Sequence, residues 1–178
     1  LNYYEKKICD RYYTWGNKSK YKKVYPLFCT TTIGKKVKKN IKSSILISYT
    51  EFFLKPWKSI PLPRVIDETN LYKNDIITLL NSLSKNLENQ ITLKYNTHGS
   101  QYITNNIKKK IKNLNFISTD LNKRGFEFSN NYKLNIETAN STGFIELLSL
   151  NIPVILITNK KFFNVKKEYK IYYDELIK

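Results

Sequence analysis

A polar turn that opens a helix pattern carries the clearest chemical signal in the sequence. Residues 140–157 read NSTGFIELLSLNIPVILI: a turn, a helix-patterned run and a short β-branched strand. A helix start attracts anions such as phosphate, because its first N–H groups lack partners and its dipole is positive there. Ser141 and Thr142 stand where a phosphate would bind, and the Glu146 carboxylate could cap the helix or accept sugar hydroxyls. The alternative is a capped helix without a ligand. The candidate nucleotide-binding residues are Asn140, Ser141, Thr142, Gly143 and Glu146.

Two loops that follow expected strands hold further candidates. Residues 50–64 contain three prolines, which exclude a regular helix, and they end at Arg64. Residues 96–100 contain His98, the only histidine, whose side-chain type suits acid–base chemistry near neutral pH. A lone loop histidine is also common at protein surfaces. Because α/β proteins keep functional residues in loops after strands, Arg64 and His98 are candidate cleft residues.

Short apolar runs alternate with helix-patterned segments along the rest of the chain. This alternation predicts an α/β fold: a Rossmann-like parallel sheet with helices on both faces. Neither GxGxxG nor GxxxxGK[ST] occurs, so no NAD-type cofactor and no P-loop are supported, and we expect no cofactor. The expected strands are residues 44–49, 91–95, 115–118, 134–138 and 153–157, and the expected helices are residues 68–87, 102–114 and 144–150, with a brief helix or turn in 123–131.

The chain length of 178 residues fits one sizeable core. We expect residues 1–43 to form an N-terminal segment or linker packed on the domain; for residues 12–15, a short strand and a packed linker are both compatible with the pattern. Residues 44–178 would form the Rossmann-like domain. The chain contains no Met, so it does not begin at an initiator codon; it is either processed or a piece of a longer protein.

The composition limits the classes of partner that we expect. The net charge of +17 comes almost entirely from lysines scattered along the chain, and only three residues are Arg. Because arginine is favoured for reading bases and gripping phosphates, a nucleic-acid partner is not expected. Cys9 and Cys29 have no CxxC spacing, so we expect neither a metal site nor a disulfide framework. We expect a cytoplasmic protein; a peripheral contact with the inner face of the membrane stays open.

Two motifs resemble a known family. Residues 10–16 read DRYYTWG and residues 140–153 read NSTGFIELLSLNIP. They resemble the patterns DRYxTWGW and NSTxFLETLSLNIPT of bacterial surface-carbohydrate transferases, and the resemblance spans almost the whole chain, including Pro63-Arg64 between the motifs. This chain departs from the family pattern at Asn17, Gly143 and Leu147, which replace Trp, Pro and Thr. Lys94 stands in a strand where the family has an Arg-containing segment, and it joins the candidate cleft residues.

The resemblance implies the C-terminal half of a two-domain GT-B glycosyltransferase. In that architecture, two Rossmann-like halves face each other across a cleft, and the C-terminal half binds the nucleotide part of an activated sugar. The turn from Asn140 to Thr142 would then hold the diphosphate, and Glu146 would accept the ribose hydroxyls. The implied partners are a nucleotide-sugar, a glycan or lipid-linked acceptor, and an N-terminal domain.

The implied function is glycosyl transfer in cell-surface polysaccharide biosynthesis. We expect this chain alone to be inactive, because the opposing half commonly supplies the acceptor site and the base, and only His98 is a candidate base here. The alternative is a non-catalytic, lysine-rich module that binds nucleic acid or an anionic membrane. Its binding would fall steeply with salt and would show little nucleotide preference.

Overall fold

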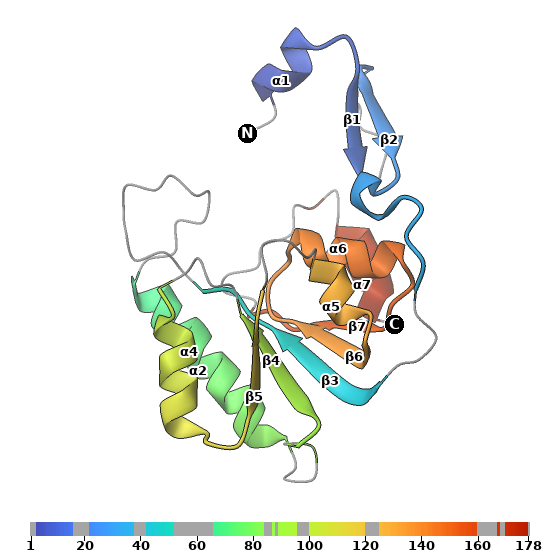
Figure 1. Cartoon of the computed structure of the whole chain (residues 1–178). Helices are drawn as coiled ribbons and strands as arrows, with labels where there is room; N and C mark the ends of the chain where they lie inside the picture. The colour runs from blue at the N-terminus through green and yellow to red at the C-terminus, as the bar shows by residue number, and fades with distance from the viewer. Residues whose placement is uncertain are drawn as a thin grey trace.

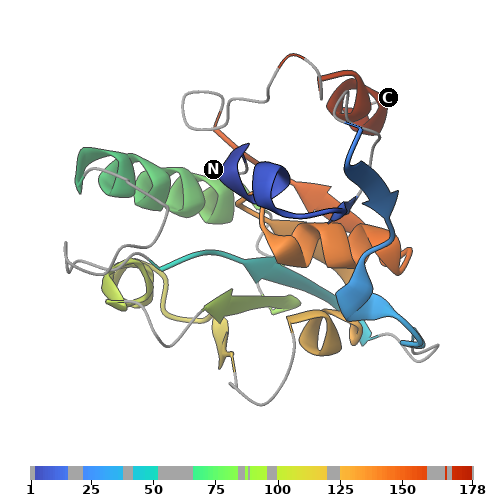
Figure 2. The same cartoon turned by 90° about the horizontal axis from the view of Figure 1, so that it is seen from above.

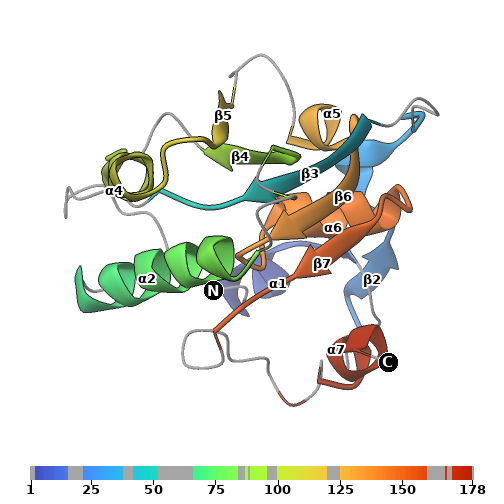
Figure 3. The ribbon, with the colours of Figure 1, turned by 90° about the horizontal axis from the view of Figure 1, so that it is seen from below.

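The core of the protein is a five-stranded sheet in which all neighbouring strands pair in parallel, in the order β5-β4-β3-β6-β7 (Figures 1 and 3). A computed structural model describes residues 3–15, 22–37, 42–51, 66–83, 87, 89–95, 100–119, 125–159, 167 and 170–177. The strands are β3 (Lys42–Ser48), β4 (Ile91–Tyr95), β5 (Asn115–Ser118), β6 (Tyr132–Glu137) and β7 (Val154–Leu156). The helices of this body are α2 (Ile66–Ser82), α4 (Tyr102–Lys110), α5 (Gly125–Ser129), α6 (Thr142–Ser149) and α7 (Lys170–Ile177).

One face of the sheet carries the main apolar core. The register places Ile47 beside Leu93 and Ile136 on neighbouring strands, so the three side chains share a face. They pack against α2 and α4, whose apolar residues recur at helical spacing, as Ile103 and Ile107 do. Each of these five side chains is at most 6% exposed, and together they form the main hydrophobic core.

The opposite face of the sheet is mixed and lies against α5 and α6 (Figure 1). Its apolar part is small and centres on Phe126, Leu147 and Ile152. Asn135 lies fully buried on this face, where its Nδ2 donates to the carbonyls of Ser129 and Pro153 at 3.3 and 3.2 Å. Buried polar groups need such partners, so this half of the core is specified by hydrogen bonds as well as by packing.

An arm precedes the body and extends away from it (Figures 1 and 2). We use the name arm for the described residues 3–15 and 22–37. It contains α1 (Tyr3–Ile8), the parallel pair β1 (Tyr12–Trp15) and β2 (Val24–Leu27), and a short 3-10 helix, η1 (Thr30–Thr32). Cys9 and Cys29 are both free thiols.

The structure confirms the predicted fold class and corrects several boundaries. The helix predicted over 102–114 ends at Lys110, because Ile111 turns to an extended backbone. The helix predicted over 68–87 ends at Ser82, although Leu83 and Leu87 beyond it still pack on the main core. The strand predicted over 153–157 shortens to β7, since Pro153 has no N–H, while its carbonyl still accepts the N–H of Asn135 at 3.0 Å.

The other expected elements appear close to their expected places. Strands β4 and β5 match the predicted 91–95 and 115–118 at both ends. The strand predicted over 134–138 begins earlier, as β6, and the strand predicted over 44–49 begins earlier, as β3. The division of the chain into residues 1–43 and 44–178 stays a prediction.

Candidate functional site

The start of α6 is open at the carboxyl edge of the sheet. Ser141 precedes the helix with an extended backbone, and its Oγ accepts the N–H of Phe144 at 3.4 Å. The N–H groups of Thr142 and Gly143 have no hydrogen-bond acceptor in the described part of the chain. Thr142 is exposed, and a Cβ on Gly143 would come within 3.4 Å of Ser141 Oγ. The structure therefore presents two unpaired donors and two hydroxyls at a helix start, which is an arrangement that favours an anion.

Three strand ends meet on the sheet face that carries α6. The register aligns Ser48 of β3 with Lys94 of β4 on one side and with Glu137 of β6 on the other. Residues aligned in this way point to the same face of the sheet. Lys94 Nζ lies 3.9 Å from Glu137 Oε1, and the two side chains are only 10% and 7% exposed. A cation and a carboxylate are thus held side by side where each strand ends.

Burial dominates the electrostatics of this pair. The pKa of the Glu137 carboxyl is raised by burial, against which Lys94 and the hydroxyls of Ser48 and Ser141 lower it. The pKa of the Lys94 ammonium is lowered by burial, against which the charges of Glu137 and Glu146 raise it. The hydroxyl of Ser141 acts on the carboxyl of Glu137 and the charge of Glu146 acts on Lys94, so α6 and the residue before it contribute to the electrostatics of the pair.

The buried pair retains unused hydrogen-bonding capacity. Glu137 Oε1 and Ser48 Oγ are buried and have no hydrogen-bond partner among the described residues, so the nearby Ser48 hydroxyl is not aligned with the carboxylate. The contact between Lys94 and Glu137 at 3.9 Å is an ion pair without hydrogen-bond geometry.

Glu146 joins α6 to the arm. Its side chain is buried, and its Oε1 accepts the hydroxyl of Thr31 from η1 at 2.6 Å. A second contact runs parallel to it, because Thr32 Oγ1 and Ser149 Oγ are 2.9 Å apart. The Thr31 bond uses one carboxylate oxygen, and Oε2 has no hydrogen bond within the described residues. Glu146 therefore supports the fold and still has an acceptor to offer.

Asn140, which precedes Ser141, contacts the C-terminal helix. Asn140 is exposed, and its Nδ2 donates to the hydroxyl of Tyr173 in α7 at 2.8 Å, so the C-terminal helix touches the turn. Arg64 and His98 lie outside the described residues, and their cleft role stays a prediction.

Of the residues singled out from the sequence, the structure brings Ser141, Thr142, Gly143 and Glu146 together with Lys94. Sequence reasoning missed Ser48, Glu137 and Thr31. Glu137 could have been found from the sequence, because it is an acid at the carboxyl end of an expected strand. Parallel sheets bind ligands at that end of their strands. Nothing in the sequence pairs Thr31 with Glu146, which are 115 residues apart.

A second helix start lies at the same edge of the sheet and is closed. Glu51 follows β3, is 3% exposed, and accepts the N–H groups of Ile103 and Thr104 at 3.2 and 2.6 Å. The hydroxyl of Thr104 donates to the same carboxylate at 2.5 Å. The start of α4 thus carries an anion that belongs to the protein itself.

The parallel sheet and the helices on both faces define a Rossmann-like α/β domain, in which the start of α6 lies at the carboxyl edge of the sheet. A family model described as LIC12162 family transferase matches residues 1–178, which is the whole chain. The chain therefore belongs to this family of transferases. No curated protein matches it.

Proposed function

We propose that this protein is the nucleotide-sugar-binding half of a GT-B type glycosyltransferase that acts in cell-surface polysaccharide biosynthesis. The observation that carries the proposal is the open start of α6 beside the buried Lys94, in a chain of a transferase family. The motif resemblance at residues 10–16 and 140–153 supplies the narrower class of reaction. Glycosyl transfer from an activated donor releases a nucleoside diphosphate, so such an enzyme needs a site for that leaving group.

The proposed diphosphate site is the first turn of α6. The N–H groups of Thr142 and Gly143 and the hydroxyls of Ser141 and Thr142 would donate to the phosphate oxygens. Lys94 would supply a positive charge from below, in a buried place where charge acts more strongly than in water. Donors fixed in advance around a developing negative charge stabilise the transition state for its departure.

The proposed ribose contact is Glu146. Thr31 holds one of its carboxylate oxygens, which orients the side chain, and Oε2 would accept a ribose hydroxyl. Because Thr31 already occupies Oε1, we assign one ribose hydroxyl to Glu146 and not two. The sugar acceptor, a glycan or a lipid-linked chain, would approach from an opposing domain that also supplies the base.

Titration with nucleoside diphosphates tests the proposal. Glu146→Gln is expected to weaken binding by about 1 to 3 kcal/mol, the range for a hydrogen bond to a charged group. Thr142→Ala is expected to weaken it less, because the backbone N–H groups remain. Glu127→Gln, an exposed acid on α5, is the matched control and should leave the affinity unchanged.

Melting curves of the same variants separate a ligand contact from a structural role. If Glu146→Gln lowers the melting temperature and leaves the affinity for nucleoside diphosphates unchanged, Glu146 supports the helix only. Equal affinity for inorganic phosphate and for nucleoside diphosphates would argue against a nucleotide site. Binding that collapses with salt and ignores the nucleotide would favour the lysine-rich binding module instead.

A further inference from the structure

The arm carries an exposed aromatic face that the proposed donor site does not use. The register pairs Tyr13 with Tyr25 across β1 and β2, and their ring centroids are 5.9 Å apart. Both rings are about half exposed, at 52% and 44%, and Trp15 lies on the same face at 39%. Because side chains alternate along a strand, these three rings project from the same face of the two-stranded sheet.

Further large apolar side chains of the arm are also exposed. They come from the helix, the end of β2 and the turn after η1, and they are Tyr4, Ile8, Phe28 and Ile33, each more than half exposed. Single exposed apolar residues are ordinary, but several large ones in one short segment mark an interaction surface. The body of the protein does not cover them.

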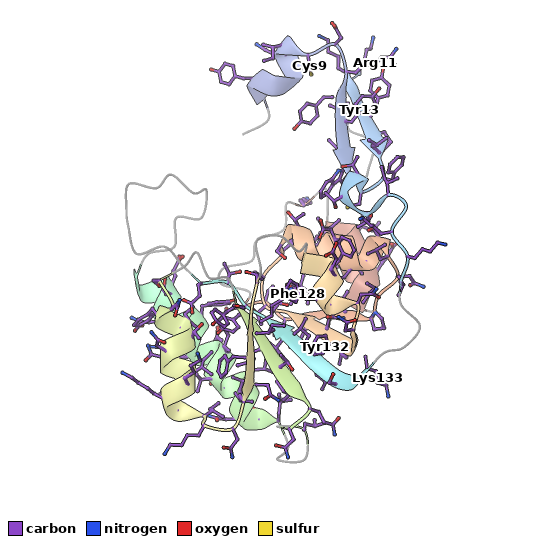
Figure 4. The ribbon with its side chains drawn as sticks, viewed as in Figure 1. Cys9, Arg11, Tyr13, Phe128, Tyr132 and Lys133 are labelled. Atoms are coloured by element: carbon purple, nitrogen blue, oxygen red, sulfur yellow. The ribbon has the colours of Figure 1, made fainter. Side chains whose placement is uncertain are left out.

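Positive charge accompanies this aromatic face. Residues 1–37 contain eight lysines and Arg11, against the two acids Glu5 and Asp10. Arg11 is fully exposed and lies beside the phenols of Tyr13 and Tyr25; the hydrogen bond with Tyr13 raises the pKa of its guanidinium. Figure 4 shows Arg11 and Tyr13 at the outer part of the arm, away from Phe128, Tyr132 and Lys133 in the body.

We propose that the arm docks on an anionic lipid surface, with Tyr13, Trp15 and Tyr25 at the headgroup level. Tyr and Trp prefer that level because they combine an apolar ring with a polar tip. Lysines around them complement the negative charge of the lipids. Exposed aliphatic side chains such as Ile8 and Ile33 gain from entering an acyl boundary and gain little from nucleic acid, which favours the membrane over RNA or DNA. None of the described helices is long and apolar enough to cross a membrane, and the contact proposed here is a surface contact.

This inference stands apart from the proposed function, since no residue of the α6 site takes part in it. Co-sedimentation of the full chain with vesicles tests it. Vesicles of phosphatidylcholine containing about one third phosphatidylglycerol should bind the chain at least tenfold more tightly than phosphatidylcholine alone, and binding should weaken as salt rises. Equal binding to the two kinds of vesicle would overturn the proposal.

Two pairs of charge-matched variants locate the contact. Lys22→Glu with Lys36→Glu, both exposed on the arm, should weaken binding to the anionic vesicles about tenfold or more. Lys109→Glu with Lys112→Glu, exposed in and just after α4, changes the net charge equally and should weaken binding less than threefold. Equal losses in the two pairs would show attraction by the whole charge and would contradict docking through the arm.

The aromatic contribution has its own readout. In a Trp57→Phe background, Trp15 is the only tryptophan, and its emission should shift to shorter wavelength when anionic vesicles are added. Tyr13→Ser with Tyr25→Ser should weaken vesicle binding several-fold without lowering the melting temperature of the body. An unshifted Trp15 emission on vesicle-bound protein, or tighter binding to homopolymer RNA than to vesicles, would refute the membrane assignment.

Discussion

Helices α4 and α6 both begin at the carboxyl edge of the sheet, but they differ in the acceptors of their first backbone N–H groups. At α4, the Glu51 carboxylate accepts two backbone N–H groups and the hydroxyl of Thr104 within 3.2 Å. At α6, Ser141 Oγ accepts a single N–H group at 3.4 Å. The first helix start is therefore completed by the fold, whereas the N–H groups of Thr142 and Gly143 at the second have no acceptor among the described residues.

The two faces of the sheet differ in the same sense. The face under α2 and α4 holds the main apolar core, with the buried Glu51 and Thr104 at the start of α4, and the face under α5 and α6 holds the buried ion pair of Lys94 and Glu137. A domain that only needed stability would gain from two apolar faces, since an isolated buried ion pair seldom stabilises a fold. The buried ion pair is therefore not explained by stability alone, and it lies on the face of the sheet that carries the proposed donor site.

Glu51→Ala should produce the largest loss of stability, because it leaves a buried helix start without its acceptor. We expect the free energy of unfolding to fall by about 4 kcal/mol, given several charge-assisted hydrogen bonds at this site. Urea denaturation measures the change, and Glu127→Ala on the surface of α5 should stay within about 0.5 kcal/mol. The affinity of the folded variant for nucleoside diphosphates should not change. If the fully folded variant bound them more weakly, Glu51 would not be a purely structural residue.

Lys94→Met should lower both stability and affinity. Removing one member of a buried ion pair leaves Glu137 uncompensated, at a cost of about 3 kcal/mol. Adding Glu137→Leu should return the stability toward that of the wild type, because both charges are then gone. Nucleoside diphosphate binding should stay weak in the double variant. Restored binding there would show that Lys94 does not contact the phosphates.

Ser141→Ala should cost about 1 kcal/mol of stability, as the loss of a helix-capping side chain usually does. The same change removes a hydroxyl from the proposed phosphate site, so the affinity for nucleoside diphosphates should also fall. Calorimetric titration and thermal melting give the two numbers. A loss of stability alone would make the start of α6 equivalent to that of α4, closed by the protein's own side chain.

Glu137→Gln should have the smallest effect, a change in the pH dependence of stability. Burial raises the pKa of Glu137 above its ordinary value of 4.5, so the folded protein holds this proton more tightly than the unfolded chain. The contribution of Glu137 to stability is therefore largest below pH 4.5 and is lost as pH rises through the raised pKa. Urea denaturation at several pH values above 4.5 should show a decline in the wild type that is weaker in Glu137→Gln. Identical profiles would mean that burial does not disfavour the Glu137 carboxylate.

The fold and the helix start at α6 could be predicted from local patterns in the sequence. The strand at Ile91–Tyr95 was predictable because an apolar alternation is bounded by polar turns, and α6 because a polar turn precedes helical spacing. The pairing of Lys94 with Glu137 was not predictable, since it depends on β3 lying between β4 and β6. The sequence alone does not fix that strand order, because several parallel orders satisfy the same hydrophobic pattern.

The hydrogen bonds that tie η1 to α6 have a thermodynamic consequence. Thr31 is bonded to Glu146 and Thr32 to Ser149, so the arm and the helix of the donor site share contacts. If a nucleotide binds at the start of α6 and holds Glu146, it also holds Thr31 through this hydrogen bond. Such coupling is reciprocal. If a donor nucleotide raises the affinity of the arm for its partner by some factor, the partner raises the affinity for the nucleotide by the same factor.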